Sequence, residues 1–266
     1  MTLRIWHQAM ASLHDLPVYA EALAAHLPKV ASEGTEVIIH GAQGDSYRGH
    51  APAEVLRYPY LRHRIQEQIF RHCLQAENEG FGAIALASFG EPFLDVCRSI
   101  VTIPIASMPE SCMLVGCSMA RRMALITLTP KNVHRVRTLV ENHTLSARVS
   151  GVYSLEPAVT EADLAAAFDA PDAILRNYIA VAERAVAEGA DLVAPAEGVL
   201  NELLYAHGVS RIGGVSNMDT IAVVIRYAEM LAGLSHISGL SVGREWTYAQ
   251  PNPALLREFT TGPEQG

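Results

Sequence analysis

The stretch that decides the fold is "EGFGAIALASFGEPFLDV", residues 79–96. Its apolar run at 83–88 is short enough for a buried strand, and a helix-like pattern follows from Pro92 onward. A second stretch, "EGADLVAPAEGVLNELL" at 188–204, has the same layout of Glu-Gly, short strand, small-residue turn and helix. The pair indicates either two equivalent halves of one molecule or a chance likeness between two ordinary strand–helix units.

Around these stretches, apolar strands alternate with longer amphipathic segments along the chain, which predicts an α/β fold with parallel sheets flanked by helices. The predicted strands are 3–7, 35–40, 83–88, 103–107, 123–127, 148–154, 191–195 and 212–216. The predicted helices are 17–31, 60–79, 92–100, 110–121, 130–143, 173–189, 196–206 and 217–233. Two equivalent halves would form two pseudosymmetric, interleaved lobes, with residues 1–115 plus 213–266 in one and 116–212 in the other. Because ligands bind beyond the carboxyl ends of parallel strands, the active site is expected in the cleft between the lobes.

The composition argues against nucleic-acid-binding, membrane-spanning, secreted and zinc-binding proteins. Half of the 266 residues are hydrophobic, and the net charge of -8 gives no electrostatic reason to expect nucleic acid or an anionic membrane as partner. No apolar run approaches the roughly 20 residues that span a bilayer, and the first residues do not resemble a signal peptide. The four cysteines form no C-x-x-C pair and no zinc pattern. We expect a cytoplasmic protein with reduced thiols and no metal.

Each of the two stretches places a polar residue at the tip of its strand. Ser88 is followed by Phe89 and Gly90, whose amides would open a helix and form an oxyanion site, although a serine here is also a common helix cap. Glu197 lies between Ala196 and Gly198 and is either a helix cap or an acid/base group. We favour the acid/base role, because Asp or Ser would cap equally well.

Three further residues are candidates for substrate binding at the same cleft. His7 and Gln8, at the end of the first strand, could donate hydrogen bonds to a carbonyl or carboxylate, although His7 is equally explained as a core residue. Glu110 begins the helix after 103–107 and is either a first-turn acid that complements the dipole or a catalytic group.

Familiar catalytic motifs are absent from the sequence. No G-x-G-x-x-G or G-x-x-x-x-G-K-[ST] motif is present, so no nucleotide cofactor is expected. The serine lacks the first glycine of a G-x-S-x-G elbow, and a hydrolase triad through Asp219 and His236 has no local support. Two cysteines near the expected cleft, Cys112 and Cys117, are alternative thiols, and Cys117 is better explained as a core residue.

The run "ASFGEPFLDVCRSIVTIPIASMPESCM" (87–113) resembles the aspartate/glutamate/hydantoin racemase superfamily, in its hydantoin and allantoin racemase branch. Ser88 falls on the branch's first cysteine and Glu110 on its glutamate, while Ala196 falls on the second cysteine with Glu197 beside it. The resemblance covers roughly residues 1–235, but "HQAM" stands where the branch has Asn-Pro-Asn-Thr. It implies a two-lobed fold, a cofactor-free site between the lobes, homo-oligomers, and two cysteines that move the proton α to a carbonyl.

Neither of those cysteines is present, and a hydroxyl has a far higher pKa than a thiol, whose reference pKa is about 8.5. Three accounts stay open. Glu197 is the principal acid/base while Ser88 orients substrate or relays a proton; or Ser88 is a nucleophile activated by a carboxylate; or Ser88 replaces a native cysteine. The first predicts a cofactor-independent isomerase of the racemase type for a small carboxylate, amide or cyclic ureide. The alternatives are a C–N hydrolase or decarboxylase in the same cleft, and a non-catalytic binder of small molecules.

Overall fold

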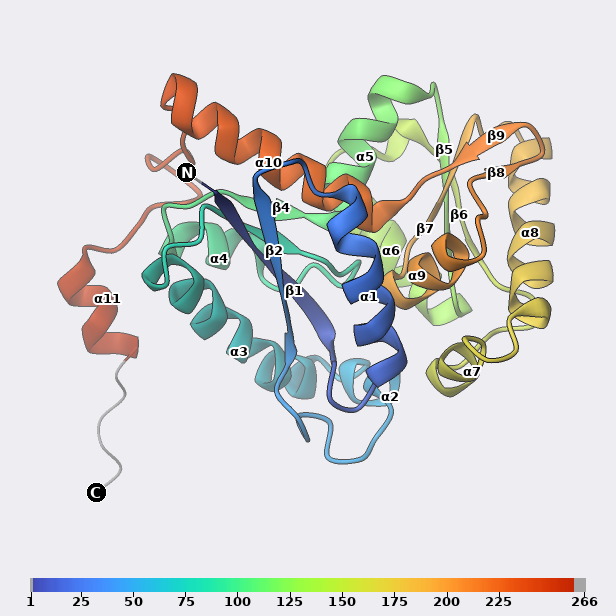
Figure 1. Cartoon of the computed structure of the whole chain (residues 1–266), viewed down its shortest axis with the longest axis horizontal. Helices are drawn as coiled ribbons and strands as arrows, with labels where there is room; N and C mark the ends of the chain where they lie inside the picture. Colours follow the sequence, from blue (N-terminus) through green and yellow to red (C-terminus); the bar gives the residue numbers. More distant parts are fainter. Residues whose placement is uncertain (1, 261–266) are drawn as a thin grey trace.

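Two sheets, one in each lobe, form the framework of the computed structural model, which describes residues 2–260 (Figure 1). The first sheet has the order β2-β1-β3-β4 and is parallel throughout. Its strands are β1 (Leu3–Ser12), β2 (Thr35–Ala42), β3 (Ala83–Leu86) and β4 (Ile105–Ser107). The helices of this part of the chain are α1 (Pro17–Val30), α2 (Pro52–Leu56), α3 (Pro59–Asn78), α4 (Leu94–Ile100) and α5 (Met108–Met119).

The second sheet has the order β6-β5-β7-β9-β8 and is parallel except for the β8–β9 pair. Its strands are β5 (Met123–Thr127), β6 (Val149–Ser154), β7 (Leu192–Pro195), β8 (Arg211–Ile212) and β9 (Val215–Asn217). Its helices are α6 (Pro130–Asn142), the 3₁₀ turn η1 (Ser146–Arg148), α7 (Glu161–Ala166), α8 (Asp172–Ala187) and α9 (Gly198–Ala206). The predicted α/β fold with two lobes is therefore confirmed. A division at residue 213 would cut the β8–β9 hairpin, so the second lobe extends to Asn217.

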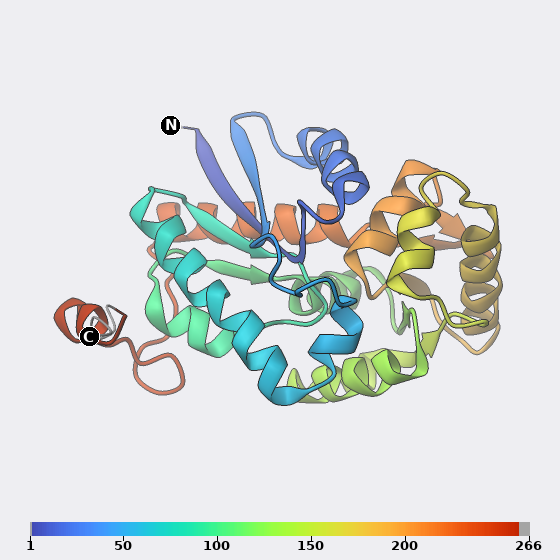
Figure 2. The ribbon, with the colours of Figure 1, turned by 90° about the horizontal axis from the view of Figure 1, so that it is seen from below.

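Helix α10 (Thr220–Ser238) returns the chain to the first lobe and runs beside its sheet in both views (Figures 1 and 2). Its amino-terminal half is buried through Ile221, Val224 and Ile225. By length and composition, it is the one helix in the described part of the chain that is apolar enough to cross a membrane, which corrects the expectation of no such run. Of the apolar window in this helix, 28% is buried within the structure.

The chain ends beside the first lobe with α11 (Pro253–Thr260), which extends away from the body (Figure 2). The guanidinium of Arg244 anchors the segment before it by donating to the carbonyl oxygens of Arg98 and Val101, each at 2.7 Å. Arg98 lies in the last turn of α4 and Val101 directly follows this helix, so the carboxyl-terminal segment is held by backbone acceptors of the first lobe.

The candidate active site between the lobes

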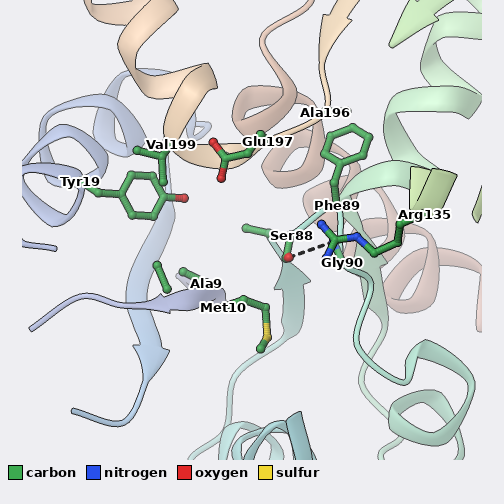
Figure 3. A pocket seen from close by; sticks show the side chains of 13 residues that line it. Ala9, Met10, Tyr19, Ser88, Phe89, Gly90, Arg135, Ala196, Glu197 and Val199 are labelled. Atoms are coloured by element: carbon green, nitrogen blue, oxygen red, sulfur yellow. Dashed lines mark hydrogen bonds between the residues drawn. The ribbon is translucent and has the colours of Figure 1, made fainter. Parts of the chain in front are cut away.

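A pocket with a cavity volume of about 80 Å³ lies where the carboxyl ends of β1, β3 and β7 meet (Figure 3). This exceeds the roughly 10–15 Å³ that a cavity needs to hold one water, so the pocket has room for a small ligand. The predicted site residues that line it are Ser88, Phe89, Gly90, Ala196, Glu197 and Gly198. The two strand tips recognised in the sequence therefore do face one pocket, as the two-halves interpretation requires.

Glu197 is both the helix cap and the tuned carboxyl group that the sequence left as alternatives. It is the N-cap of α9, and its Oε2 accepts a hydrogen bond from the Leu200 amide at 2.6 Å. Burial raises its pKa to about 7, and Glu161 acts in the same direction, while the amide hydrogen bonds and Arg135 oppose the rise. A carboxyl group that titrates near neutral pH is suited to accept and return a proton at that pH.

Ser88 lies in a turn, not at a helix start. Strand β3 ends at Leu86 and α4 begins only at Leu94, so the prediction that the Phe89 and Gly90 amides open a helix is wrong. The Gly90 amide donates to the Ser88 Oγ at 3.0 Å, and a Cβ at position 90 would lie 3.2 Å from that oxygen. The serine hydroxyl is thus positioned by its own turn, and the glycine leaves it uncrowded.

Tyr19 is a pocket residue that the sequence did not indicate. It lies near the start of α1, and its hydroxyl points into the space near Glu197 and Ser88 (Figure 3). Burial and the nearby Glu197 raise the pKa of this phenol well above its ordinary value, so it remains a hydrogen-bond donor at neutral pH. A Cβ at Gly198 would lie 2.8 Å from the Tyr19 hydroxyl, which explains why α9 begins with glycine.

Arg135, on α6 of the second lobe, was also missed. Its guanidinium reaches the pocket beside Ser88 and Gly90 (Figure 3), and its Nε is buried with no hydrogen-bond partner among the described residues. The sequence around it, "PKNVHRVRTL", reads as an ordinary amphipathic helix with several basic residues. Nothing in that pattern separates this arginine from its exposed neighbour Arg137; only the packing of α6 against the first lobe does.

His7 and Gln8, which the sequence predicted as substrate-binding residues, do not line the pocket. Strand β1 continues to Ser12, so its carboxyl end presents Ala9, Met10 and Ala11 in their place. His7 is fully buried, and this burial lowers its pKa to about 4. The Gln8 amide accepts from Trp6 Nε1 and contacts His72 Nδ1, each at 2.9 Å, and donates to the Ala9 carbonyl.

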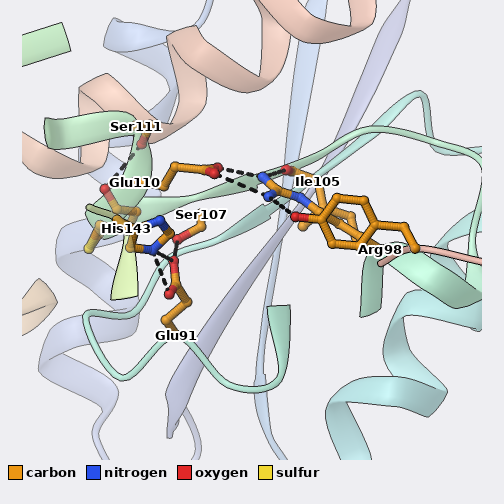
Figure 4. A network of polar contacts seen from close by, with 9 residues as sticks. Glu91, Arg98, Ile105, Ser107, Glu110, Ser111 and His143 are labelled. Carbon is orange, nitrogen blue, oxygen red and sulfur yellow. Dashed lines mark hydrogen bonds and ion pairs between the residues drawn. The ribbon is translucent and has the colours of Figure 1, made fainter. Parts of the chain in front are cut away.

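Glu110 is also outside the pocket, and its carboxylate is engaged by Arg98 through a two-point ion pair (Figure 4). Arg98 donates in addition to the Ile105 carbonyl at 3.1 Å. The structure therefore does not bring Glu110 to the pocket with the other predicted site residues. The residue links α5 to α4 within the first lobe.

A neighbouring contact joins the two lobes (Figure 4). Glu91, in the turn that carries Ser88, accepts a hydrogen bond from the Ser107 hydroxyl and lies 2.8 Å from His143 Nε2 at the end of α6. The Glu91 carboxylate raises the pKa of His143. This turn is also strained, because Glu91 and Phe93 have φ of 42° and 50°. The position of Ser88 thus depends on a contact with the opposite lobe.

The Asp219–His236 triad and the alternative thiols considered from the sequence do not lie at this pocket. Asp219 lies 2.9 Å from Nε2 of the buried His26, whose Nδ1 lies 2.9 Å from Glu202, and no triad with His236 forms. Cys112 is fully buried, which raises the pKa of its thiol, and its Sγ lies 3.8 Å from the Thr220 carbonyl oxygen. No cysteine lines the pocket, and within residues 2–260 no three His, Cys, Asp or Glu side chains could hold a metal ion together.

The sequence and the fold of this chain are similar to those of known racemases. The hydantoin racemase of Pseudomonas sp. (strain NS671) is 23% identical over 200 residues, covering 75% of this chain and 76% of the relative. The Rhizobium meliloti hydantoin racemase is 23% identical over 184 residues, covering 66% and 69%. The structure of allantoin racemase from Klebsiella pneumoniae superposes with a TM-score of 0.76 at 18% identity, covering 94% of both chains, and so shares the fold. Residues 18–196 match the family described as Asp/Glu/Hydantoin racemase, so the chain belongs to the Asp/Glu/hydantoin racemase family.

Proposed function

We propose that Glu197 removes and returns the proton on the carbon α to a carbonyl of a small molecule bound between the lobes. The family makes the chain an isomerase of the racemase type, which acts without a cofactor. The observation that supports Glu197 as the base is its pKa of about 7 in a pocket that Ser88, at the end of the equivalent strand, also lines. General bases work best when their pKa lies near the working pH.

In this scheme the Glu197 carboxylate takes the α proton, and the electron pair left on carbon moves into the carbonyl to give an enolate. The hydroxyls of Tyr19 and Ser88 donate hydrogen bonds to the developing negative charge, since each faces the pocket as a protonated donor at neutral pH. Return of the proton to the same face restores the substrate. On the other face, the Ser88 hydroxyl gives its proton to carbon while it takes one from water, and Glu197 then releases its proton to water, which gives the mirror-image product with no net change in protons.

Ser88 is assigned as donor and relay, not as base. A hydroxyl holds its proton too tightly to replace a thiol, and its oxygen already accepts the Gly90 amide at 3.0 Å. The substrate is a small carboxylate, amide or cyclic ureide with an acidic C–H. The names of the relatives support the ureide class, and the cavity of about 80 Å³ supports a small ligand.

The test is deuterium uptake at the α carbon. The protein and its Glu197→Gln variant would be incubated in D₂O with hydantoins, ureides and α-substituted carboxylates, and the products analysed by NMR and chiral chromatography. Exchange that requires Glu197 supports the assignment. Exchange that survives in Glu197→Gln contradicts it, and cleavage products without exchange contradict the whole scheme.

We further propose that the protein works in the cytoplasm as a homo-oligomer. Four free cysteines suit a reducing compartment. The apolar side chains of Met230, Ile237 and Leu240 are exposed at the far end of α10 and in the residues after it, and such surfaces often lie between subunits. Light scattering of the purified chain decides the oligomeric state, and a monomer at micromolar concentration contradicts the proposal.

A further inference from the structure

Arg135 has no role in the scheme above, although it is the cationic group of the pocket wall. Its Nε is buried and makes no hydrogen bond to any residue in the described range, and its guanidinium points toward Ser88 (Figure 3). The charged groups that act on it are Arg62 from α3, Glu161 from α7 and Glu197. Of these, Glu197 lines the pocket with it.

Arg98 shows what the same side chain does elsewhere in this molecule. There both terminal nitrogens reach the two oxygens of Glu110, which satisfies the planar fork of a guanidinium. A guanidinium stays charged, and burying part of it without a hydrogen-bonded anion is unfavourable. Glu197 does not provide a full counter-charge at neutral pH, because with a pKa of about 7 it is protonated about half the time.

We propose that Arg135 binds a carboxylate carried by the carbon that loses its proton, so that the substrates are open-chain carboxylates in preference to neutral cyclic ureides. This inference rests on the proposed function of the pocket and names its substrate class. The guanidinium fork matches the two oxygens of a carboxylate, whereas the carbonyl of a neutral ring accepts hydrogen bonds but does not neutralise the charge.

The same contact serves the reaction. When the Glu197 carboxylate takes the α proton, the electron pair left on carbon delocalises into the substrate carboxylate and gives an enediolate with one more negative charge. Arg135 lies where that charge develops and stabilises it without moving. Return of the proton from Glu197 restores the α C–H on the same face. On the other face, Ser88 gives its proton to carbon and regains one from water, and Glu197 releases its proton to water, so neither route changes the number of protons.

A matched pair of ligands tests the inference: N-carbamoylalanine and 5-methylhydantoin share one carbon skeleton, and ring closure removes the carboxylate. Binding to the intact protein is measured by calorimetry at pH 7, followed by α-deuterium exchange with each compound. We expect the open-chain acid to bind about 10- to 100-fold more tightly than the ring. Arg135→Met should abolish this preference and Arg135→Lys should keep part of it, while Arg137→Met, on the exposed side of the same helix, should retain it fully.

Equal or tighter binding of the neutral ring by the intact protein overturns the inference, and so does a preference that survives in Arg135→Met. If Arg135→Met does not fold, the preference of the intact protein and the behaviour of Arg135→Lys decide. The two proposals fail separately. Loss of the acid preference with exchange retained removes only the role of Arg135, whereas acid binding without any exchange removes only the proposed reaction.

Discussion

The two strand tips that face the pocket, Ser88 after β3 and Glu197 after β7, differ in what the chain does next. After β7, helix α9 starts at Gly198, and Glu197 is held by the Leu200 amide. After β3, the chain turns through residues 87–93 before α4 begins, and this turn is held to the other lobe by the Glu91–His143 contact. The tip with the ionisable group is thus fixed by its own helix, and the tip with the hydroxyl is fixed by lobe packing.

This difference supports Glu197, at the end of β7, as the acid/base group. The rigid tip keeps a carboxylate at a constant position, which proton transfer requires. The tip on the turn supplies a donor whose position follows the arrangement of the two lobes. Substitutions at or behind Glu197 should therefore strongly affect the reaction rate or the overall stability. Substitutions in the turn that carries Ser88 should have smaller effects on the rate and on local dynamics.

The largest effect is expected from Glu197→Gln, which keeps an oxygen to cap Leu200 but removes the base. The rate of α-proton exchange should fall by about 10²- to 10⁴-fold, as measured by NMR in D₂O. In the unchanged protein, kcat/KM should rise with pH through about 7 as Glu197 ionises.

The raised pKa of Glu197 also predicts how the stability of the protein depends on pH. Because the folded state raises the pKa of Glu197, it binds the extra proton, and the free energy of unfolding should decrease as pH rises from about 4.5 to about 7. Urea titrations should show that Glu197→Gln loses this dependence. An equal pH dependence in both proteins would contradict burial as the cause of the shift.

The next largest effect is expected from the buried network of charged residues that packs behind α9. His26 lies between Glu202 and Asp219 at 2.9 Å from each, and these carboxylates raise its pKa to about 9 against the opposing effect of burial. His26→Leu leaves two carboxylates facing each other and should lower the free energy of unfolding by about 3–5 kcal/mol in urea denaturation. This contribution is fully present below pH 6.5 and is lost as pH rises through about 9. His236→Leu, on the exposed side of α10, is the control and should change stability little.

At the first tip, Ser88→Ala should slow α-proton exchange by about 10- to 100-fold, because one donor to the enolate is lost. Ser88→Cys should restore or exceed the original rate, since a thiol transfers a proton more readily than a hydroxyl. Both variants are assayed as for Glu197→Gln. An unchanged rate in Ser88→Ala would show that the hydroxyl only positions the turn.

The smallest effect is expected from Glu91→Gln, which weakens the contact between the turn and α6. The loss should be about 1 kcal/mol, since the pair is mostly buried but not enclosed. Hydrogen exchange measured by mass spectrometry should show faster exchange in residues 87–93 and little change in α9. The stabilisation from His143 should disappear as pH rises through its raised pKa, after being complete below 6.5.

The sequence predicted the parts of the site that follow from local pattern. A short apolar run ended by a small-residue turn identified both tips, and the carboxyl-end rule for parallel strands placed Ser88 and Glu197 in one cleft. Strand β5 was predicted at its observed bounds for the same reason, because five consecutive buried residues form a clear signal.

The site features that the sequence did not predict depend on tertiary contacts. The end of β1 was placed five residues early, because "HQAMAS" mixes polar and small residues and the pairing with β2 is irregular between Gln8 and Ser12. This error moved His7 and Gln8 into the predicted site. Glu110 was assigned to the cleft because it follows a strand end and matches the glutamate of the racemase branch. Its ion pair with Arg98 joins two helices and could not be predicted from local pattern. Tyr19 and Arg135 come from helices whose sequence shows only an amphipathic pattern, so lobe packing alone brings them to the pocket.

The central claim is that one carboxylate performs the proton transfer in a pocket without a thiol. It is tested most directly by measuring deuterium uptake at the α carbon of 5-methylhydantoin and N-carbamoylalanine, across pH 5–9, for the unchanged protein and Glu197→Gln. The account predicts uptake that rises through about pH 7 in the unchanged protein and nearly vanishes in the variant. Uptake that is independent of Glu197, or its absence with both compounds in the unchanged protein, would contradict it.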